Sequence, residues 1–438
     1  MRHQAIDSSL FVQNRQRFAR QMKPDSLAIF HSNDAMPRNG DQHYSYRQHS
    51  DFFYLTGVQQ KDSVLIIFPD TPKKDFKEVL FIKKETEHAR IWEGEKLTKT
   101  EATNLSGIEQ VVWLSQYHTV LHDLIKNSKR IYINGNESQG AEDEILTRDL
   151  RLGNELMKRY PMHKYHRSQP ILRNLRMIKS PVEIELIRKA LQITHHGFDK
   201  VMASVKPGMW EYQLEALLTG SFIHDGAQGH AYEPIVASGS SACVLHYITN
   251  SEKCQAGDLV LLDFGAEYAN YSADITRTIP VNGRFSERQA TVYNAVLKVL
   301  RETKEMMVPG VLLEELNQEV GKMMSHALVD IGLLDKSEIN PKDSKKQPYR
   351  RYFMHGVAHH LGLDVHDLSD RYSPFQAGMV LTCEPGIYIP EEKMGIRLEN
   401  NILITDDGPV DLASDIPIEI EDIEAHMQES EFSAIDHS

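Results

Sequence analysis

The stretch LVLLDFGAEYANYSADITRTIPV, residues 259–281, decides the fold of the second half of the chain. Both of its ends are apolar runs of strand length, and Asn270 near the middle is a turn candidate. We expect two antiparallel strands that fold back at residues 268–269, which would place Asp263 opposite Asp274. Side chains opposed in an antiparallel pair lie on one face with Cβ atoms about 5 Å apart. Two carboxylates so close repel each other unless a cation lies between them, although either aspartate alone also fits a turn or cap role.

Further along the chain, histidine and carboxylate residues recur among glycine and apolar residues. Residues 355–366 contain four histidines, namely His355, His359, His360 and His366. Glu384 precedes a Pro-Gly turn, and Arg397 and Glu399 share one face of a strand by its two-residue period. Each glutamate alone would be interpreted as a surface residue. With the aspartate pair they make four carboxylates and at least one imidazole, which suit two adjacent divalent ions, Mn²⁺ first, with Co²⁺ or Zn²⁺ as alternatives.

The composition excludes several classes of protein. The 438 residues carry 62 acidic and 49 basic side chains, a formal net charge of -13, and 41% hydrophobic residues, as in soluble globular proteins of two or three domains. The acid excess argues against nucleic-acid partners and against docking on an anionic membrane. The three cysteines form no CxxC pair, and we find neither a signal-peptide-like apolar core nor a membrane-length apolar run. These features predict a reduced, cytoplasmic protein.

The order of apolar runs predicts an α/β domain at residues 1–165, because strand-length runs alternate with helical segments. The runs are 26–30, 63–68, 78–82 and 130–133, and the helical segments are 11–21 and 117–127. Residues 161–170 begin and end with proline and are interpreted as a linker. Residues 172–410 combine long helices with antiparallel strand pairs, an α+β pattern, and the first of these helices starts at Ser180.

The last segment, residues 411–438, has nine acidic residues and no lysine or arginine. We interpret it as a solvated, partly disordered tail, with a partner-binding tail as the alternative.

The joint order of the motifs resembles the pita-bread metallopeptidases, most closely the aminopeptidase P (Xaa-Pro aminopeptidase) branch. That order is Asp-x-Gly, Asp-x-Thr-Arg-Thr, His-Gly-x-x-His, Glu-Pro-Gly and Arg-x-Glu. Residues 46–57 look like the N-terminal domain of that branch, and residues 178–184 look like its first catalytic-domain helix. The resemblance implies a pita-bread catalytic domain with a curved, mostly antiparallel sheet.

The resemblance also implies roles, motif position by motif position. The metal ligands would be Asp263, Asp274, His359, Glu384 and Glu399. The catalytic residues would be His246, His355, His366, Glu384 and Arg397, with Arg397 supporting a ligand carboxylate. A hydroxide bridging two divalent ions would attack the first peptide bond of substrates with proline in second place. Glu384 would pass the proton to the leaving proline nitrogen, and the enzyme would be a dimer or tetramer.

Two related activities and one different class are the alternatives. Prolidase shares the fold and the ligands but accepts Xaa-Pro dipeptides only, and methionine aminopeptidase normally lacks an N-terminal domain of this size. Some pita-bread proteins are catalytically inactive binding modules, which generally lose metal ligands. The complete ligand set in this sequence disfavours the binding module.

Overall fold

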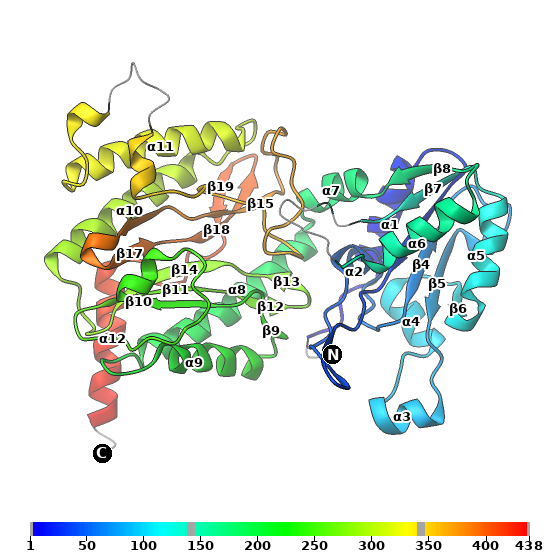
Figure 1. Cartoon of the computed structure of the whole chain (residues 1–438), viewed down its shortest axis with the longest axis horizontal. Helices are drawn as coiled ribbons and strands as arrows, with labels where there is room; N and C mark the ends of the chain where they lie inside the picture. Colours follow the sequence, from blue (N-terminus) through cyan, green and yellow to red (C-terminus); the bar gives the residue numbers. More distant parts are fainter. Residues whose placement is uncertain (1–2, 136, 138–144, 340–346, 436–438) are drawn as a thin grey trace. The chain divides into compact units, whose positions relative to one another are not determined.

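The computed structural model describes residues 3–135, 137, 145–339 and 347–435 (Figure 1). It forms two compact units, which divide between Arg176 and Met177. The expected order of an α/β unit followed by an α+β unit is confirmed. No helix within the described ranges is both long and apolar enough to cross a membrane.

The first unit is built on one six-stranded mixed sheet. Its strands are β1 (Ser26–His31), β4 (Val64–Ile67), β5 (Glu78–Ile82), β6 (Val111–Trp113), β7 (Arg130–Ile133) and β8 (Lys164–Arg167). They lie in the order β6-β5-β4-β1-β7-β8, and β4 runs antiparallel to both of its neighbours. A separate hairpin joins β2 (Pro37–Asn39) to β3 (Gln42–His43).

Helices pack on the sheet of the first unit through apolar side chains. The helices up to residue 177 are α1 (Ser9–Gln21), α2 (Ser50–Thr56), α3 (Glu87–Glu93), α4 (Lys99–Ser106), α5 (Tyr117–Lys126), α6 (Arg148–Arg159) and α7 (Gln169–Met177). α3 has no buried residue and takes no part in this packing. Leu27 and Ile29 of β1 belong to a buried cluster with Leu121 of α5. Phe30, on the opposite face of β1, packs edge-on against Phe18 of α1. Alternate side chains of β1 therefore pack against helices on opposite faces of the sheet.

The linker prediction for residues 161–170 is wrong. This segment contains β8, which pairs in parallel with β7 at the edge of the sheet. The Tyr165 hydroxyl donates to the carbonyl oxygens of Leu156 at 2.7 Å and Tyr160 at 3.0 Å. An edge strand tolerates polar side chains because one side of it faces water, and the flanking prolines lie outside the paired residues.

The second unit carries antiparallel strands between helices (Figure 1). The helices are α8 (Pro181–Met202), α9 (Glu211–His224), α10 (Glu287–Met306), α11 (Leu313–Asp330) and α12 (Ile420–Ile435). The strands are β9 (Gly229–His230), β10 (Ile235–Ser238), β11 (Leu259–Phe264), β12 (Ala266–Tyr268), β13 (Tyr271–Ser272), β14 (Ile275–Pro280), β15 (Val380–Cys383), β16 (Gly386–Ile389), β17 (Met394–Arg397), β18 (Asn400–Thr405) and β19 (Gly408–Asp411). Ser180 caps α8 in a capping box with Glu183, as its sequence predicts.

The hairpin at residues 259–281 forms, but its register differs from the prediction. Ala269 and Asn270 both have positive φ, 50° and 67°, and form the two-residue loop. The fold-back point therefore shifts by one residue, and Asp263 pairs with Thr276 instead of Asp274. A two-residue change of partner keeps every side chain on its face, so the two aspartates still point the same way.

The expectation of a solvated, partly disordered tail at residues 411–438 is wrong for the part that the structure describes. Gly408–Asp411 pairs with β18, and Ile420–Ile435 is helical. Ile423 and Met427 of α12 are 0% and 5% exposed, so this helix packs on the body of the unit despite its acidic sequence. Asp436, counted in the acidic segment, lies outside the described residues.

The close approach of two segments of the backbone at Gly265 and Ala273 gives a stability prediction. A Cβ atom at this position would lie 1.8 Å from the carbonyl oxygen of Ala273. We expect Gly265→Ala to lower the free energy of unfolding by at least about 2 kcal/mol, because the obstruction is backbone that cannot rotate away. Urea or thermal unfolding of the full chain measures the loss.

Gly220 on the exposed side of α9 is the matched control, since an added Cβ meets nothing within 4 Å there. Gly220→Ala should stabilise the protein by about 0.5–1 kcal/mol through helix propensity. Equal stabilities for the two variants would contradict the close approach at Gly265.

Candidate metal centre and active site

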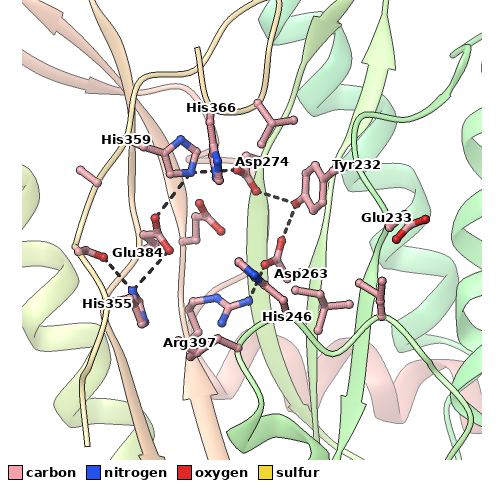
Figure 2. A pocket seen from close by; sticks show the side chains of 17 residues that line it. Tyr232, Glu233, His246, Asp263, Asp274, His355, His359, His366, Glu384 and Arg397 are labelled. Atoms are coloured by element: carbon pink, nitrogen blue, oxygen red, sulfur yellow. Dashed lines mark hydrogen bonds and ion pairs between the residues drawn. The ribbon is translucent and has the colours of Figure 1, made fainter. Parts of the chain in front are cut away.

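A cavity of about 670 Å³ in the second unit collects every site residue that the sequence predicts (Figure 2). These nine residues are His246, Asp263, Asp274, His355, His359, His366, Glu384, Arg397 and Glu399. His246 comes from the segment between β10 and β11. The others come from the hairpin β11–β14, from the loop before β15, and from the two bends β15–β16 and β17–β18. Segments up to about 150 residues apart in sequence are thus brought to one place.

Backbone pairing sets the position of the two bends and the histidine loop. The His359 N–H donates to Thr382 Oγ1 at 3.0 Å, and the Thr382 N–H donates to the His359 carbonyl oxygen at 2.9 Å. The Glu384 N–H donates to the carbonyl oxygen of Val357 at 2.9 Å. The loop that carries His359 is therefore attached to the strand that leads into Glu384.

Asp263 and Asp274 meet at one phenol, that of Tyr232. The Tyr232 oxygen lies 2.6 Å from Oδ1 of each aspartate (Figure 2). The second oxygen of Asp263 forms a short ion pair with the Arg397 guanidinium. Burial, together with the neighbouring carboxylates, raises the pKa of Tyr232, so its proton stays on the oxygen as a hydrogen-bond donor.

Glu399 is held from the hairpin side by Thr276. The Thr276 hydroxyl donates to Glu399 Oε2 at 2.7 Å and accepts from Nε of Arg397 at 3.1 Å. Glu399 lies after the end of β17 and outside any strand, unlike the prediction. The shared hydroxyl nevertheless shows that Arg397 and Glu399 reach the same side, as predicted. One oxygen of the Glu399 carboxylate is thereby occupied.

His359 lies between two carboxylates. Its Nε2 atom is 3.4 Å from Asp274 Oδ2 and 3.6 Å from Glu384 Oε1, while its Nδ1 atom lies 3.1 Å from the His360 carbonyl oxygen. Burial alone would lower the pKa of His359, but the hydrogen bond to Asp274 and the nearby charges outweigh it and raise the pKa to about 9. Ligand atoms of Asp274, His359 and Glu399 all lie within 4.8 Å of one another.

Burial in the cavity affects the charge of Asp263, Glu384 and Glu399. Burial raises the pKa of Glu384 to about 7, and burial and mutual repulsion raise the pKa values of Asp263 and Glu399 as well. Among the residues that line the cavity, Arg397 is the single guanidinium or ammonium group. Oxygen donors in excess of cations are what divalent ions of hard character require, so the donor set fits such ions.

The other three histidines, His246, His355 and His366, also line the cavity. Nε2 of His355 lies 2.8 Å from the Tyr388 hydroxyl, which also accepts from Arg397 at 3.0 Å. The ring of His366 lies edge-on to that of His359, with ring centroids 4.4 Å apart. His246 is exposed on the cavity side. All three rings are within reach of a molecule that fills the cavity.

Three residues of the site were not assigned a role by sequence reasoning. Thr276 and Tyr388 lie inside the quoted motifs, two residues after Asp274 and four after Glu384, so their strand positions offered a signal. Tyr232 lies 31 residues before Asp263 in a segment without any motif, and no local pattern indicates it.

The chain is similar to known metallopeptidases over nearly its whole length. Residues 185–406 match metallopeptidase family M24, and residues 11–132 match the aminopeptidase P N-terminal domain. The Xaa-Pro aminopeptidase of Haemophilus influenzae is 35% identical over 429 residues, which cover 95% of this chain and 96% of the relative. The human Xaa-Pro aminopeptidase 3 is 32% identical over 413 residues, which cover 91% of this chain and 80% of that protein.

The chain is also similar to solved structures of aminopeptidase P over nearly its whole length. A zinc-substituted aminopeptidase P of Escherichia coli in complex with product superimposes with a TM-score of 0.87 at 32% identity. The superposition covers 98% of this chain and 99% of that chain.

The raised pKa values predict how the metal-free protein responds to pH. A group whose folded-state pKa is raised contributes stability that is complete below its unfolded pKa and is lost as the pH rises through the folded value. The pKa of Glu384 is raised from 4.5 to about 7, so its contribution to stability is lost between these pH values. The pKa of His359 is raised from 6.5 to about 9, so its contribution is lost between pH 6.5 and about pH 9. We therefore expect the melting temperature of chelator-treated protein to fall from pH 5 to pH 9, measured by calorimetry.

Glu384→Gln, which cannot titrate, is the control for that measurement. Its melting temperature should fall less than that of the wild-type protein between pH 5 and pH 7, where the Glu384 carboxyl group titrates. Parallel curves over the whole range would show that Glu384 keeps its ordinary pKa.

Proposed function

The chain belongs to metallopeptidase family M24, and on that premise we propose that it is an Xaa-Pro aminopeptidase. It is a metallo-exopeptidase, and the proposal concerns its substrates, its ions and the roles of its residues. The observation that carries the proposal is the cavity in which all nine expected residues meet. The names of the relatives, and the match of the first unit to the aminopeptidase P N-terminal domain, support proline in the second position of the substrate.

Two divalent ions are proposed, held by Asp263, Asp274, His359, Glu384 and Glu399. Mn²⁺ is the first expectation, with Co²⁺ and Zn²⁺ as alternatives. The chemistry that such ions supply when bound is the acidification of a water molecule and the stabilisation of negative charge on a carbonyl oxygen.

The side chains of the cavity transfer the proton, bind the substrate carbonyl group and hold the ligands in position. Glu384 accepts the proton of the attacking water and delivers it to the proline nitrogen as the peptide bond breaks, because its carboxylate faces the cavity between His355 and His359. His246 and His366 donate to the scissile carbonyl oxygen and the tetrahedral intermediate. His355 lines the side that receives the proline ring, and Arg397 holds Asp263 in place.

Glu384→Gln should lower kcat by at least about 10³-fold, because the amide keeps the shape of the side chain but cannot take the proton. The rate is to be measured at saturating Mn²⁺ with the metal content of the variant determined in the same sample. A variant that carries the wild-type amount of metal and turns over at nearly the wild-type rate would contradict this role.

Substrate length separates the proposed activity from that of prolidase. With Mn²⁺ present, we expect release of the first residue from Xaa-Pro-Yaa tripeptides and longer peptides, and none from the matched Xaa-Ala-Yaa peptides. Cleavage of Xaa-Pro dipeptides alone would indicate a prolidase. Prolonged chelation should abolish activity, and readdition of Mn²⁺ should restore it.

A homo-oligomer, either a dimer or a tetramer, and a cytoplasmic location complete the proposal. The oligomer is supported by the resemblance to the family, and the location by three cysteines that form no CxxC pair. Sedimentation velocity of the full chain distinguishes these states from a monomer.

A further inference from the structure

The buried arginine Arg277 of β14 has no role in the proposed chemistry. Its side chain nevertheless contacts the segments that hold the proposed metal ligands. Its side chain is 0% exposed, and all three of its nitrogen atoms donate hydrogen bonds. On the hairpin side, Nη1 donates to the carbonyl oxygens of Thr276 at 2.9 Å and Glu399 at 2.7 Å. Nη2 donates to Asn400 Oδ1 at 2.8 Å.

These contacts complete a set of bonds around Glu399. Its N–H donates to the Thr276 carbonyl oxygen at 3.1 Å, and its carbonyl oxygen accepts from Arg277. Its carboxylate accepts from the Thr276 hydroxyl at 2.7 Å. The backbone and the side chain of Glu399 are therefore both tied to β14, the strand that begins directly after Asp274.

The other side of the guanidinium is occupied by the segment after β19. Nε of Arg277 donates to the Pro417 carbonyl oxygen at 2.7 Å, and Nη2 donates to that of Ile416 at 3.3 Å. The Tyr293 hydroxyl of α10 donates to the next carbonyl oxygen, that of Ile418, at 2.7 Å. Residues 416–418 thus present consecutive carbonyl oxygens to donors from β14 and α10.

We propose that Arg277 is a positioning residue that holds Glu399 against the Asp274 strand, and that residues 416–418 keep Arg277 in place. The inference rests on the proposed role of Asp274 and Glu399 as metal ligands. A planar guanidinium reaches carbonyl oxygens on both of its sides at once, which the single ammonium group of a lysine cannot do. Partners that orient ligands typically change metal affinity by about 10- to 100-fold when they are altered.

The test compares the Mn²⁺ affinity of the full-length wild-type protein with that of Arg277→Lys. Chelator-stripped protein is titrated with Mn²⁺, and the free ion is followed by electron paramagnetic resonance. We expect the variant to bind Mn²⁺ about 10- to 100-fold more weakly. A folded Arg277→Lys protein whose affinity stays within about twofold of wild type would overturn the inference.

Arg15 of α1 is the matched control for the loss of a buried guanidinium. It is also 0% exposed, and it donates to the carbonyl oxygens of Leu55 and Ser106, each at 2.8 Å, in the first unit. Arg15→Lys should lower the melting temperature but leave the Mn²⁺ affinity unchanged. Equal weakening of Mn²⁺ binding in both variants would mean that general destabilisation is the cause, and would also overturn the inference.

If Arg277→Lys does not fold, the variant Tyr293→Phe tests the inference instead. This variant removes only the hydroxyl that donates to the Ile418 carbonyl oxygen. We expect a two- to fivefold loss of Mn²⁺ affinity, the size of one neutral hydrogen bond, and an unchanged affinity would count against the inference. A wild-type protein that binds no Mn²⁺ overturns the proposed function itself. Normal wild-type binding with unaffected variants overturns only the role of Arg277.

Discussion

Mutual repulsion among four carboxylates in one cavity is the constraint on which the second unit depends. Asp274 and Glu399 are almost fully buried, and Asp263 and Glu384 are largely so. Removing such groups from water without a counter-charge costs several kcal/mol each. The fold has to hold them together against this cost, and it does so with antiparallel strands whose backbone bonds are independent of the side-chain charges. The remaining cost is what gives the cavity its affinity for cations.

Three of the proposed ligands, Asp263, Glu399 and His359, have protein partners that leave part of the carboxylate or imidazole available. Tyr232 and Arg397 hold Asp263, Thr276 holds Glu399, and the His360 carbonyl oxygen fixes the outer nitrogen of His359. Such partners restrict rotation, so that the free lone pairs point into the cavity before an ion arrives. The same partners limit which rotamers the side chains can adopt when a substrate enters.

Local patterns in the sequence predicted the helix that starts at Ser180 and strands such as Val64–Ile67. The nine expected site residues came from short motifs together with the resemblance to the family. The features that the sequence did not predict correctly depend on contacts between residues far apart in the chain or on backbone conformation. The register of the hairpin depended on Ala269, which takes positive φ although its side chain disfavours it. Tyr232 and the contacts of Arg277 depend on segments far away in sequence. Charge alone suggested a disordered tail, whereas two apolar residues one helical turn apart, Ile423 and Met427, dock α12.

The order of the contacts along the chain has a consequence for biosynthesis. The side chains proposed to hold the ions are spread from Asp263 to Glu399, and the carbonyl oxygens that occupy Arg277 follow at Ile416 and Pro417. A ribosome adds residues in sequence order, and N-terminal domains generally fold first. A nascent chain therefore has a foldable first unit long before it has a complete cavity. Metal acquisition becomes one of the last steps of its maturation, and a prematurely terminated chain would lack the full set of ligands.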